Sequence, residues 1–394
     1  MPCLLNRFTL AAAALVALNL GAAGEDADQS TPATFSKTDA RPTLHVVRPA
    51  ATTAPTGYAP LQIRHAYGID LLTNGGAGQV IAIVDAYGSP TMQKDLNKFS
   101  TTFGLPTNTV QIVYGTSAPK GSDAGWALET ALDLQWAHAV APNAKLILAV
   151  ASSATLPNLL AAVDAAVKAG ATVVTMSWIS AEFPSEASYD FHFQKTNVTF
   201  LASSGDNGAK PGWPAASPSI TSVGGTTLKL DALGNLTAPE TGWTGSGGGF
   251  STYFARPVCQ NGWQTNSHRA FPDISLVADP ATGVSVYDST PYAGQSGWFS
   301  VGGTSASCPM WGGLVALANE KRALVSKPLL GNINPVLYAI AGSFSSPGVS
   351  LYGYFFFDVS AGSNGGFSAT PNYDEVTGLG TPAALNLVPG MAAY

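Results

Sequence analysis

Ser305 is the first of several side chains in this 394-residue sequence whose type and setting could support covalent chemistry. It lies in VGGTSASCPMWGGLVAL (301–317), where a glycine-rich turn leads into an apolar helical pattern with Pro309 expected in the first turn. A serine at the start of a helix is expected to be exposed and to lie beside the positive end of the helix dipole, which suits a nucleophile. Serine is also a favourable N-cap residue, so the segment alone leaves a structural role open.

Two acidic residues four positions apart form the second candidate group. Glu129 and Asp133 lie in GWALETALDLQWAHAVAP (125–142), and on a helix this spacing places both on one face. Like charges at that spacing repel, so the pair costs stability unless it is solvated or shares a proton. A solvated face is the usual explanation, but five large apolar neighbours argue against a fully exposed helix: Trp126, Leu128, Leu132, Leu134 and Trp136.

Asp206 is the third candidate. It follows the apolar run that opens FLASSGDNG (200–208), so it would stand at the carboxyl end of a buried strand, where α/β proteins assemble their sites. A glycine-flanked acid also forms Asx-turns, and that local role accounts for the segment when it is considered alone.

The elements that must position these residues alternate between strands and helices. Short apolar runs typical of buried parallel strands are 80–84, 146–150, 172–176 and 199–202. Helical patterns cover 92–99, 126–139 and 156–169. This alternation predicts βαβ units, and hence an α/β fold with a parallel central sheet covered by helices on both faces. Residues 224–303 are richer in Gly, Thr and Trp and are expected to form strands and loops of the same single domain.

The composition narrows the possible partners. Charged residues make up only 11% of the chain, and 18 Lys and Arg against 24 Asp and Glu give a formal net charge of -6. No basic stripe is available to neutralise phosphates, which argues against nucleic acid as a partner. If the carboxylates are protonated, few positive groups remain to repel one another, so the fold is expected to tolerate acid.

The N-terminus has the pattern of an export signal. One positive charge precedes an apolar run (8–20), followed by small residues up to Gly24 and then acidic residues. We expect a signal peptide over 1–24, a linker or short pro-segment over 25–57, and the catalytic domain over 58–394. A retained anchor is the alternative, but the run is short for a membrane span and no later segment is long enough. The mature chain, without Cys3, is therefore expected to be secreted, either extracellular or periplasmic, and free of the membrane.

The three candidate segments in this order resemble the sedolisin family, the serine-carboxyl peptidases with a subtilisin-like fold. The resemblance runs from about Tyr58 to the C-terminus and includes GGAGQVIAIVDAY (75–87), SVGGTT (222–227), SGGGFS (246–251) and PDISLVADPATG (272–283). It implies that Ser305 is the nucleophile and Glu129 its general base. Asp133 would orient Glu129, and Asp206 would donate a hydrogen bond to the oxyanion. Asp85 matches the position of the catalytic aspartate of related subtilisins and is expected to act, if at all, from behind these residues.

The chemistry of carboxyl groups supports these implied roles independently. A histidine base would be protonated and inactive at low pH, whereas a carboxylate with a pKa near 4.3 still accepts a proton there. Asp206 can donate a hydrogen bond only when it is protonated, which also requires acid. We therefore expect activity that falls as the pH rises above about 5 to 6.

A fourth segment, FDVSAGSNGGFSATPNYDEVTGLGTP (357–382), has two acids around an oxygen-rich loop, the kind of ligand set that Ca²⁺ prefers. A turn-rich loop with solvated acids is the alternative. The family keeps a calcium site here, and the resemblance implies one structural Ca²⁺ ion. Its ligands would be the side chains of Asp358 and Asp374 and the carbonyls of Val359, Thr370 and Asn372.

Three features depart from the family pattern. Only residues 25–57 precede the expected catalytic domain, where members usually carry a large pro-domain. Ile179 follows Trp178 where the family commonly has glycine, so it is expected to narrow or reshape the cleft beside bound substrate. Cys308 lies just behind the nucleophile, and the sequence leaves open whether it pairs with Cys259.

The sequence leaves two alternatives to a monomeric, calcium-stabilised acid endopeptidase acting on polypeptides. A Ser-His-Asp mechanism on the same fold would need a histidine on the helix after Asp85, where Glu129 stands, and His138 is interpreted as structural. The other alternative is a catalytically weak or inactive homologue that acts as a secreted binding module.

Overall fold

The computed structural model describes residues 39–46, 51–346 and 348–394, which belong to one compact unit, Lys37–Tyr394. The expected signal peptide, 1–24, lies outside the described residues, as do 25–38 and 47–50 of the expected linker. Among the described helices, none has both the length and the hydropathy needed to cross a bilayer.

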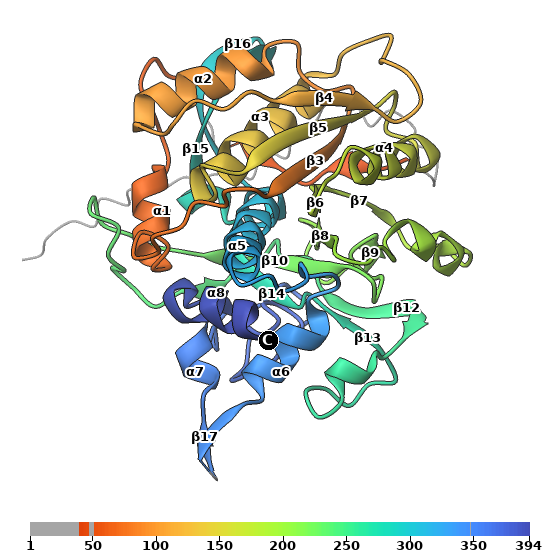
Figure 1. The fold of residues 1–394 in the computed structure, drawn as a ribbon, viewed down its shortest axis with the longest axis vertical. Coiled ribbons are helices and arrows are strands. Elements are labelled where there is room, and N and C mark those ends of the chain that lie inside the picture. The colour runs from red at the N-terminus through yellow and green to blue at the C-terminus, as the bar shows by residue number, and fades with distance from the viewer. Residues whose placement is uncertain (1–38, 47–50, 347) are drawn as a thin grey trace, which may run out of the picture. The chain divides into compact units, whose positions relative to one another are not determined.

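A central sheet of eight strands organises the fold (Figure 1), and the predicted parallel sheet is confirmed. Seven strands run parallel to their neighbours, and β11 is added antiparallel to the end of β10. The order is β11-β10-β8-β6-β3-β5-β4, with β14 also paired to β10. The strands are β3 (Val80–Ala86), β4 (Gln111–Tyr114), β5 (Lys145–Ala151), β6 (Val173–Met176), β8 (Thr199–Ser203), β10 (Thr221–Thr227), β11 (Thr241–Gly242) and β14 (Ile274–Val277).

Helices cover both faces of this sheet. The larger core packs α3 (Ala124–Val140) and α5 (Thr304–Leu324) against one face, where their buried residues meet those of several strands. The other face is covered by α4 (Leu156–Lys168). Because α3 and α5 are buried on almost every side, both are apolar all round except for a few polar positions. The remaining helices are α1 (Pro60–Ala66), α2 (Met92–Phe103), α6 (Asn334–Ala341), α7 (Tyr352–Phe355) and α8 (Ala384–Ala393), with 3-10 turns Glu186–His192, Val258–Gln260 and Pro280–Thr282.

Short antiparallel pairs surround the central sheet. The described N-terminal part of the expected linker contributes two of them, because β1 (Arg41–Pro42) pairs with β7 (Trp178–Ala181) and β2 (His45–Val46) pairs with β16 (Gln295–Gly302). The others are β9 (Gly212–Trp213) on β7, β15 (Val284–Tyr292) on β16, β12 (Gly249–Ala255) with β13 (His268–Phe271), β17 (Phe344–Ser346) with β18 (Val349–Ser350), and β19 (Phe356–Phe357) with β20 (Thr381–Pro382).

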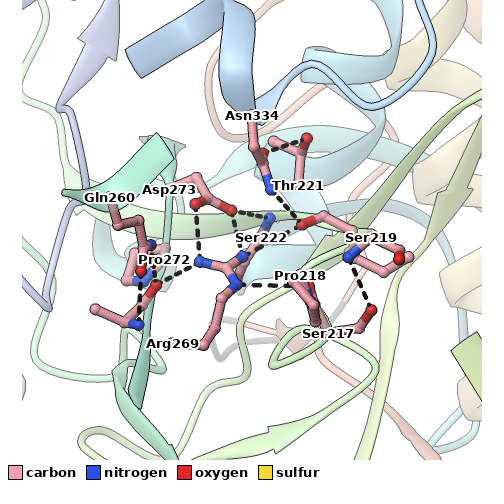
Figure 2. A network of polar contacts seen from close by, with 12 residues as sticks. Ser217, Pro218, Ser219, Thr221, Ser222, Gln260, Arg269, Pro272, Asp273 and Asn334 are labelled. Atoms are coloured by element: carbon pink, nitrogen blue, oxygen red, sulfur yellow. Dashed lines mark hydrogen bonds and ion pairs between the residues drawn. The ribbon is translucent and has the colours of Figure 1, made fainter. Parts of the chain in front are cut away.

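A buried ion pair holds β13 to the start of β14 (Figure 2). Arg269 donates Nη1 to Asp273 Oδ1 at 2.9 Å and Nη2 to Oδ2 at 2.6 Å, and neither side chain is exposed. Asp273 also accepts the N–H of Ser222 at 2.8 Å and the hydroxyl of Tyr338 at 3.0 Å. The guanidinium additionally donates to the Ile220 carbonyl at 3.2 Å. This network ties the loop before β10, the strand β13 and helix α6 together.

The start of α5 and the state of its cysteine can now be compared with the sequence predictions. The helix begins at Thr304, so Pro309 lies in its second turn rather than its first. Proline has no N–H, so the Ser305 carbonyl at this point receives no helical hydrogen bond from it. Cys308 is buried, Cys259 is partly exposed, and both are free thiols rather than a disulfide.

Candidate active site

Ser305 stands in the first turn of α5, two residues after Gly303. Gly303 has φ of +105°, and a Cβ there would lie 2.3 Å from the Thr43 carbonyl oxygen and 2.5 Å from Asp206 Oδ2, so only glycine fits. The expectation that Ser305 is exposed is wrong, because its side chain is fully buried. Its hydroxyl lies 2.8 Å from Thr43 Oγ1 and donates to the Ser177 carbonyl at 3.3 Å. The N-terminal segment Asp39–Val46 therefore contacts the candidate nucleophile.

Glu129 and Asp133 of α3 are fully buried, as is Asp85 near the end of β3. Neither α3 acid is therefore part of a solvated face. Asp133 Oδ1 accepts the Ser177 hydroxyl at 2.9 Å, and Asp85 Oδ2 accepts the Thr130 hydroxyl at 3.0 Å. Both Glu129 oxygens, Asp133 Oδ2 and Asp85 Oδ1 are buried without a hydrogen-bond partner among the described residues. These free acceptors are available to a proton that the acids share.

Burial raises the pKa of all three acids. It raises the pKa of Glu129 well above the ordinary value, and the negative charges of Asp133 and Asp85 raise it further. Burial and the Asp85 charge likewise raise the pKa of Asp133, and burial raises that of Asp85 to about 7. The Ser305 hydroxyl is near enough to Glu129 to lower its pKa in part, and Glu129 acts in the same way on Asp133. Ser305, Glu129 and Asp133 are therefore neighbours, but the Ser305 hydroxyl is hydrogen-bonded to Thr43 and to the Ser177 carbonyl rather than to a Glu129 oxygen.

Asp206 lies just after the carboxyl end of β8 and faces α5. Its Oδ1 accepts the N–H of Thr304 at 2.8 Å and the Thr304 hydroxyl at 2.7 Å. These partners are 98 residues away in sequence, so Asp206 is not held by a local Asx-turn. Its Oδ2 is buried without a hydrogen bond, and His45 Nε2 lies 3.4 Å from it. Burial raises the pKa of Asp206 to about 6, against the opposing charge of His45.

Some residues near the site were missed by the sequence analysis. Thr43 and His45 lie in the stretch interpreted as a linker. Ser203 lies at the end of β8, and no local sequence pattern marks it as a residue near the site. Thr43 donates its hydroxyl to Ser203 Oγ at 2.7 Å. No periodicity or motif could have indicated this, because the contact between Thr43 and Ser305 spans 262 residues.

Ile179 and His138 are both buried. Ile179 is on β7, and its Cδ1 would lie 2.9 Å and 2.2 Å from Cβ atoms added to Gly205 and Gly212, so it packs directly on those two glycines. His138 is buried and contacts the Pro106 carbonyl through Nε2 at 2.8 Å, away from Ser305. His45 contacts Asp206 rather than the serine. Among the described residues, no histidine is hydrogen-bonded to the Ser305 hydroxyl, as a Ser-His-Asp mechanism would require.

The candidate calcium loop offers only oxygen atoms as metal ligands. The Asn372 N–H donates to both oxygens of Asp358 at 3.1 Å, and Asp374 Oδ2 accepts the Thr370 N–H at 3.1 Å. The Asn372 carbonyl accepts the Tyr352 hydroxyl at 3.0 Å. In the described part of the chain neither acid pairs with Lys or Arg, and no group of three His, Cys, Asp or Glu side chains is placed to hold a metal. Any cation here would therefore depend on two carboxylates and backbone carbonyls.

A parallel sheet, a serine at the start of a buried central helix and acidic groups near that serine define the subtilisin-like class of α/β folds. The chain belongs to the subtilase family, because the family model described as "Subtilase family" matches residues 123–328. The chain is also similar to kumamolisin of Bacillus sp. (strain MN-32), with 32% identity over 381 residues, 85% of this chain and 64% of that protein. Tripeptidyl-peptidase 1 of Dictyostelium discoideum is 31% identical over 354 residues, 79% of this chain and 54% of that protein.

Solved structures agree with these relatives. Pseudomonas sedolisin, a serine-carboxyl proteinase complexed with two molecules of pseudo-iodotyrostatin, gives a TM-score of 0.72 at 26% identity, over 86% of this chain and 99% of that chain. A lanthipeptide protease at 16% identity and a TM-score of 0.51 shows the shared fold. The resemblance to the sedolisin family is thus confirmed. The chain spans less than two thirds of the length of the two curated relatives described above.

Proposed function

We propose that this chain is a secreted, acid-active serine-carboxyl endopeptidase that hydrolyses polypeptides through an acyl-enzyme on Ser305. The observation that carries the proposal is the convergence of Ser305, the buried acids Glu129 and Asp133, and Asp206 at the start of α5. A monomer is the proposed active form, and residues 1–24 are the proposed export signal.

In the proposed reaction, Ser305 Oγ attacks the substrate carbonyl carbon while Glu129 takes the hydroxyl proton. Asp133 orients Glu129 and shares a proton with it. Protonated Asp206 donates a hydrogen bond to the developing oxyanion, and the Ser305 N–H is the second donor. The C–N bond then breaks as Glu129 returns the proton to the leaving amine. Water hydrolyses the resulting ester by the same route and regenerates Ser305.

The proposed activity in acid follows from the need for Asp206 to be protonated. Its pKa is raised to about 6 by burial, so the donor form is populated below that pH and is lost above it. Oδ2 is the atom that supports this role, because it is buried without a hydrogen bond and Oδ1 is already engaged by Thr304. One oxyanion donor is worth about 2.7–4 kcal/mol of transition-state stabilisation, which makes its loss with rising pH measurable.

The proposal includes one structural Ca²⁺ ion in the C-terminal loop. The loop supplies the hard oxygen donors that calcium prefers. The side chains of Asp358 and Asp374 and the carbonyls of Val359, Thr370 and Asn372 would hold it. The ion would supply positive charge between two acids that have no basic partner in the described structure.

Hydrolysis of a fluorogenic peptide from pH 3 to 7 tests the function. Ser305→Ala and Glu129→Ala should each lower kcat/KM by roughly 10³-fold or more, since nucleophile and base act as a unit. Ser307→Ala is the matched control, because Ser307 lies on the same buried helix but donates to the Leu276 and Val277 carbonyls instead. It should keep its activity. Near-normal hydrolysis by either site variant would contradict the assignment.

A further inference from the structure

The backbone of Thr43 marks the place that a substrate residue takes in the proposed reaction. Its carbonyl accepts the Ser305 N–H at 3.0 Å, and its own N–H donates to the Ser177 carbonyl at 3.2 Å. A scissile carbonyl must lie against Ser305 in the same way, because Ser305 supplies both the nucleophile and one oxyanion donor. The surroundings of the Thr43 side chain therefore show the space that is offered to the residue preceding the scissile bond.

The Thr43 side chain lies in a confined space between two segments of the chain. Thr43 is 3% exposed, and its hydroxyl donates to Ser203 Oγ at 2.7 Å and lies 3.3 Å from the Ser177 carbonyl. Ile179 follows two residues after Ser177, and positions two apart in an extended segment share one face. Ile179 in turn packs on Gly205, two residues after Ser203. A side chain longer than that of Thr43 therefore meets Ile179 next.

Ile179 fills the room that two glycines leave beside this space. A Cβ on Gly205 would lie 2.9 Å from Ile179 Cδ1, and a Cβ on Gly212 would lie 2.2 Å from the same atom and 2.5 Å from Cγ1. Among the described residues, and apart from the chain neighbours of Gly205, no other atom lies within 4 Å of that first point. One isoleucine side chain thus occupies room that is otherwise bounded by residues without side chains.

The neighbours of Ile179 hold it in this position. Trp178 donates its indole N–H to the Val84 carbonyl at 3.0 Å, which anchors β7 to β3. On the other side, Ser180 faces Trp213 in the antiparallel pairing of β7 with β9. Isoleucine is also branched at Cβ, so its χ1 angle has few alternatives. A bulky substrate side chain therefore meets a wall that is costly to displace.

Resting on the proposed function, we propose that Ile179 determines specificity by restricting cleavage to bonds preceded by glycine, alanine, serine or threonine. Threonine fits this space, as Thr43 shows. Leucine and phenylalanine extend beyond the Ser203 contact and collide with Ile179, so their carbonyl group does not reach the Ser305 N–H. The exclusion acts on the alignment of the scissile carbonyl, and it is therefore expressed in kcat/KM. The substrates of this enzyme are polypeptide segments rich in small residues.

Peptides that differ only in the residue before the scissile bond test the proposal at pH 4. They carry alanine, leucine or phenylalanine at that position, and the masses of the products identify the bond that is cut. Wild-type kcat/KM should be higher for alanine than for phenylalanine by about 10²-fold or more. Ile179→Ala should reduce this ratio by roughly tenfold or more, chiefly through faster cleavage after phenylalanine. Equal wild-type cleavage after alanine and phenylalanine would overturn the proposal.

Two further variants isolate the effect of the isoleucine side chain. Ile179→Val removes only Cδ1, the atom nearest to both glycines, so its preference should lie between those of wild type and Ile179→Ala. It retains more of the packing and serves in place of Ile179→Ala if that variant does not fold. Ile147→Ala is the matched control, because it truncates a similarly buried isoleucine on β5, which pairs with β3 and β4 rather than with β7. Unchanged preference in both Ile179 variants, or the same change in Ile147→Ala, would contradict the assignment.

The same measurements separate the failure of this proposal from that of the proposed function. If hydrolysis is abolished by Ser305→Ala but is fastest after phenylalanine or leucine, the specificity proposal alone fails. If folded wild-type protein hydrolyses none of the peptides, the proposed function fails, and the specificity proposal fails with it. Hydrolysis that requires Ser305, prefers alanine, and accepts phenylalanine once Ile179 is shortened supports both.

Discussion

Glu129, Asp133 and Asp85 are buried together with no basic side chain among the groups that shift their pKa values. Two adjacent carboxylates cannot both be ionised in such a setting at moderate cost, so the group retains protons well above pH 4. A general base in this group must be able to accept a proton while its neighbour holds one. The raised pKa of Glu129 makes it a stronger base once it is ionised, but it also means that Glu129 must lose its own proton before it can accept that of Ser305.

Asp206 gives the sharpest test at the level of one residue. Wild-type kcat/KM should fall as the pH rises through about 6, because Asp206 then loses the proton that it donates. Asp206→Asn keeps a hydrogen-bond donor at every pH, so its activity should extend towards pH 7. The amide could cost up to about 4 kcal/mol of transition-state stabilisation at the optimum if it fits poorly. The measurement is the pH profile of kcat/KM for both proteins.

The acids on α3 provide an alternative explanation for the same loss of activity at rising pH. Coupled groups titrate together, so the wild-type profile alone does not assign it. If the activity of Asp206→Asn falls over the same pH range as that of the wild type, the loss of activity is caused by the titration of Glu129 and Asp133. A wild-type optimum at pH 7 or above would contradict the carboxyl mechanism for both.

The sequence was sufficient to select these residues but not to place their partners. Glu129 and Asp133 could be predicted because their spacing puts both on one helix face, and Ser305 because a glycine turn precedes its helix. Asp206 could be placed at a strand end, but its hold on Thr304 could not. Contacts such as that of Thr43 are set by tertiary folding, and local patterns do not encode them.

At the level of elements, agreement follows the length of the apolar run. The predicted strand over 80–84 is β3 (Val80–Ala86), and the predicted helix over 126–139 is α3 (Ala124–Val140), because each is a sustained, predominantly apolar run. Two-residue strands such as β1 and β2 exist only through pairing with β7 and β16. Their sequences carry no periodicity of their own, and for that reason they could not be predicted.

The ion pair between β13 and β14 should be essential to the stability of that region. Arg269→Met and Asp273→Asn should each lower the free energy of unfolding by about 3–5 kcal/mol, because each leaves a buried charge or its partners uncompensated. Urea unfolding in the Ser305→Ala background checks this without self-digestion. Asp164→Asn is the matched control, since its contact with His192 at 2.9 Å is half-exposed and should be worth about 0–1 kcal/mol. Equal effects from Asp273→Asn and Asp164→Asn would contradict the argument.

The C-terminal loop supplies a second prediction at this level. If it binds calcium, saturating Ca²⁺ at a hundredfold excess over Kd should stabilise the fold by about 2.7 kcal/mol. A chelator should therefore lower the Tm, and metal analysis of the purified protein should find one calcium per chain. Asp358→Asn should abolish the response to chelator, whereas Asp164→Asn, on a different surface, should keep it. An unchanged Tm together with no bound metal would contradict the site.

The whole molecule is built with few bases and several buried acids. Burial raises the pKa of Asp85 and Asp288 to about 7, of Asp206 to about 6 and of Glu186 to about 8. In the unfolded chain the same groups would titrate near 4. Between pH 4 and 8 the folded state therefore holds more protons than the unfolded state. Linkage then requires the stability to be full below about pH 4 and to fall as the pH rises through these folded-state pKa values.

We therefore expect the free energy of unfolding of Ser305→Ala to fall by at least about 1 kcal/mol from pH 4 to pH 8, the equivalent of one pKa unit at a single group. Urea unfolding midpoints at pH 4, 6 and 8 measure this. Asp288→Asn in the same background removes one proton-binding group, whose Oδ2 has no hydrogen-bond partner in the described structure. Its pH dependence should be shallower than that of the parent, because the amide binds no proton in this range. Stability that rises towards pH 8, or an identical slope in the two proteins, would show that these buried acids do not set the acid tolerance of the fold.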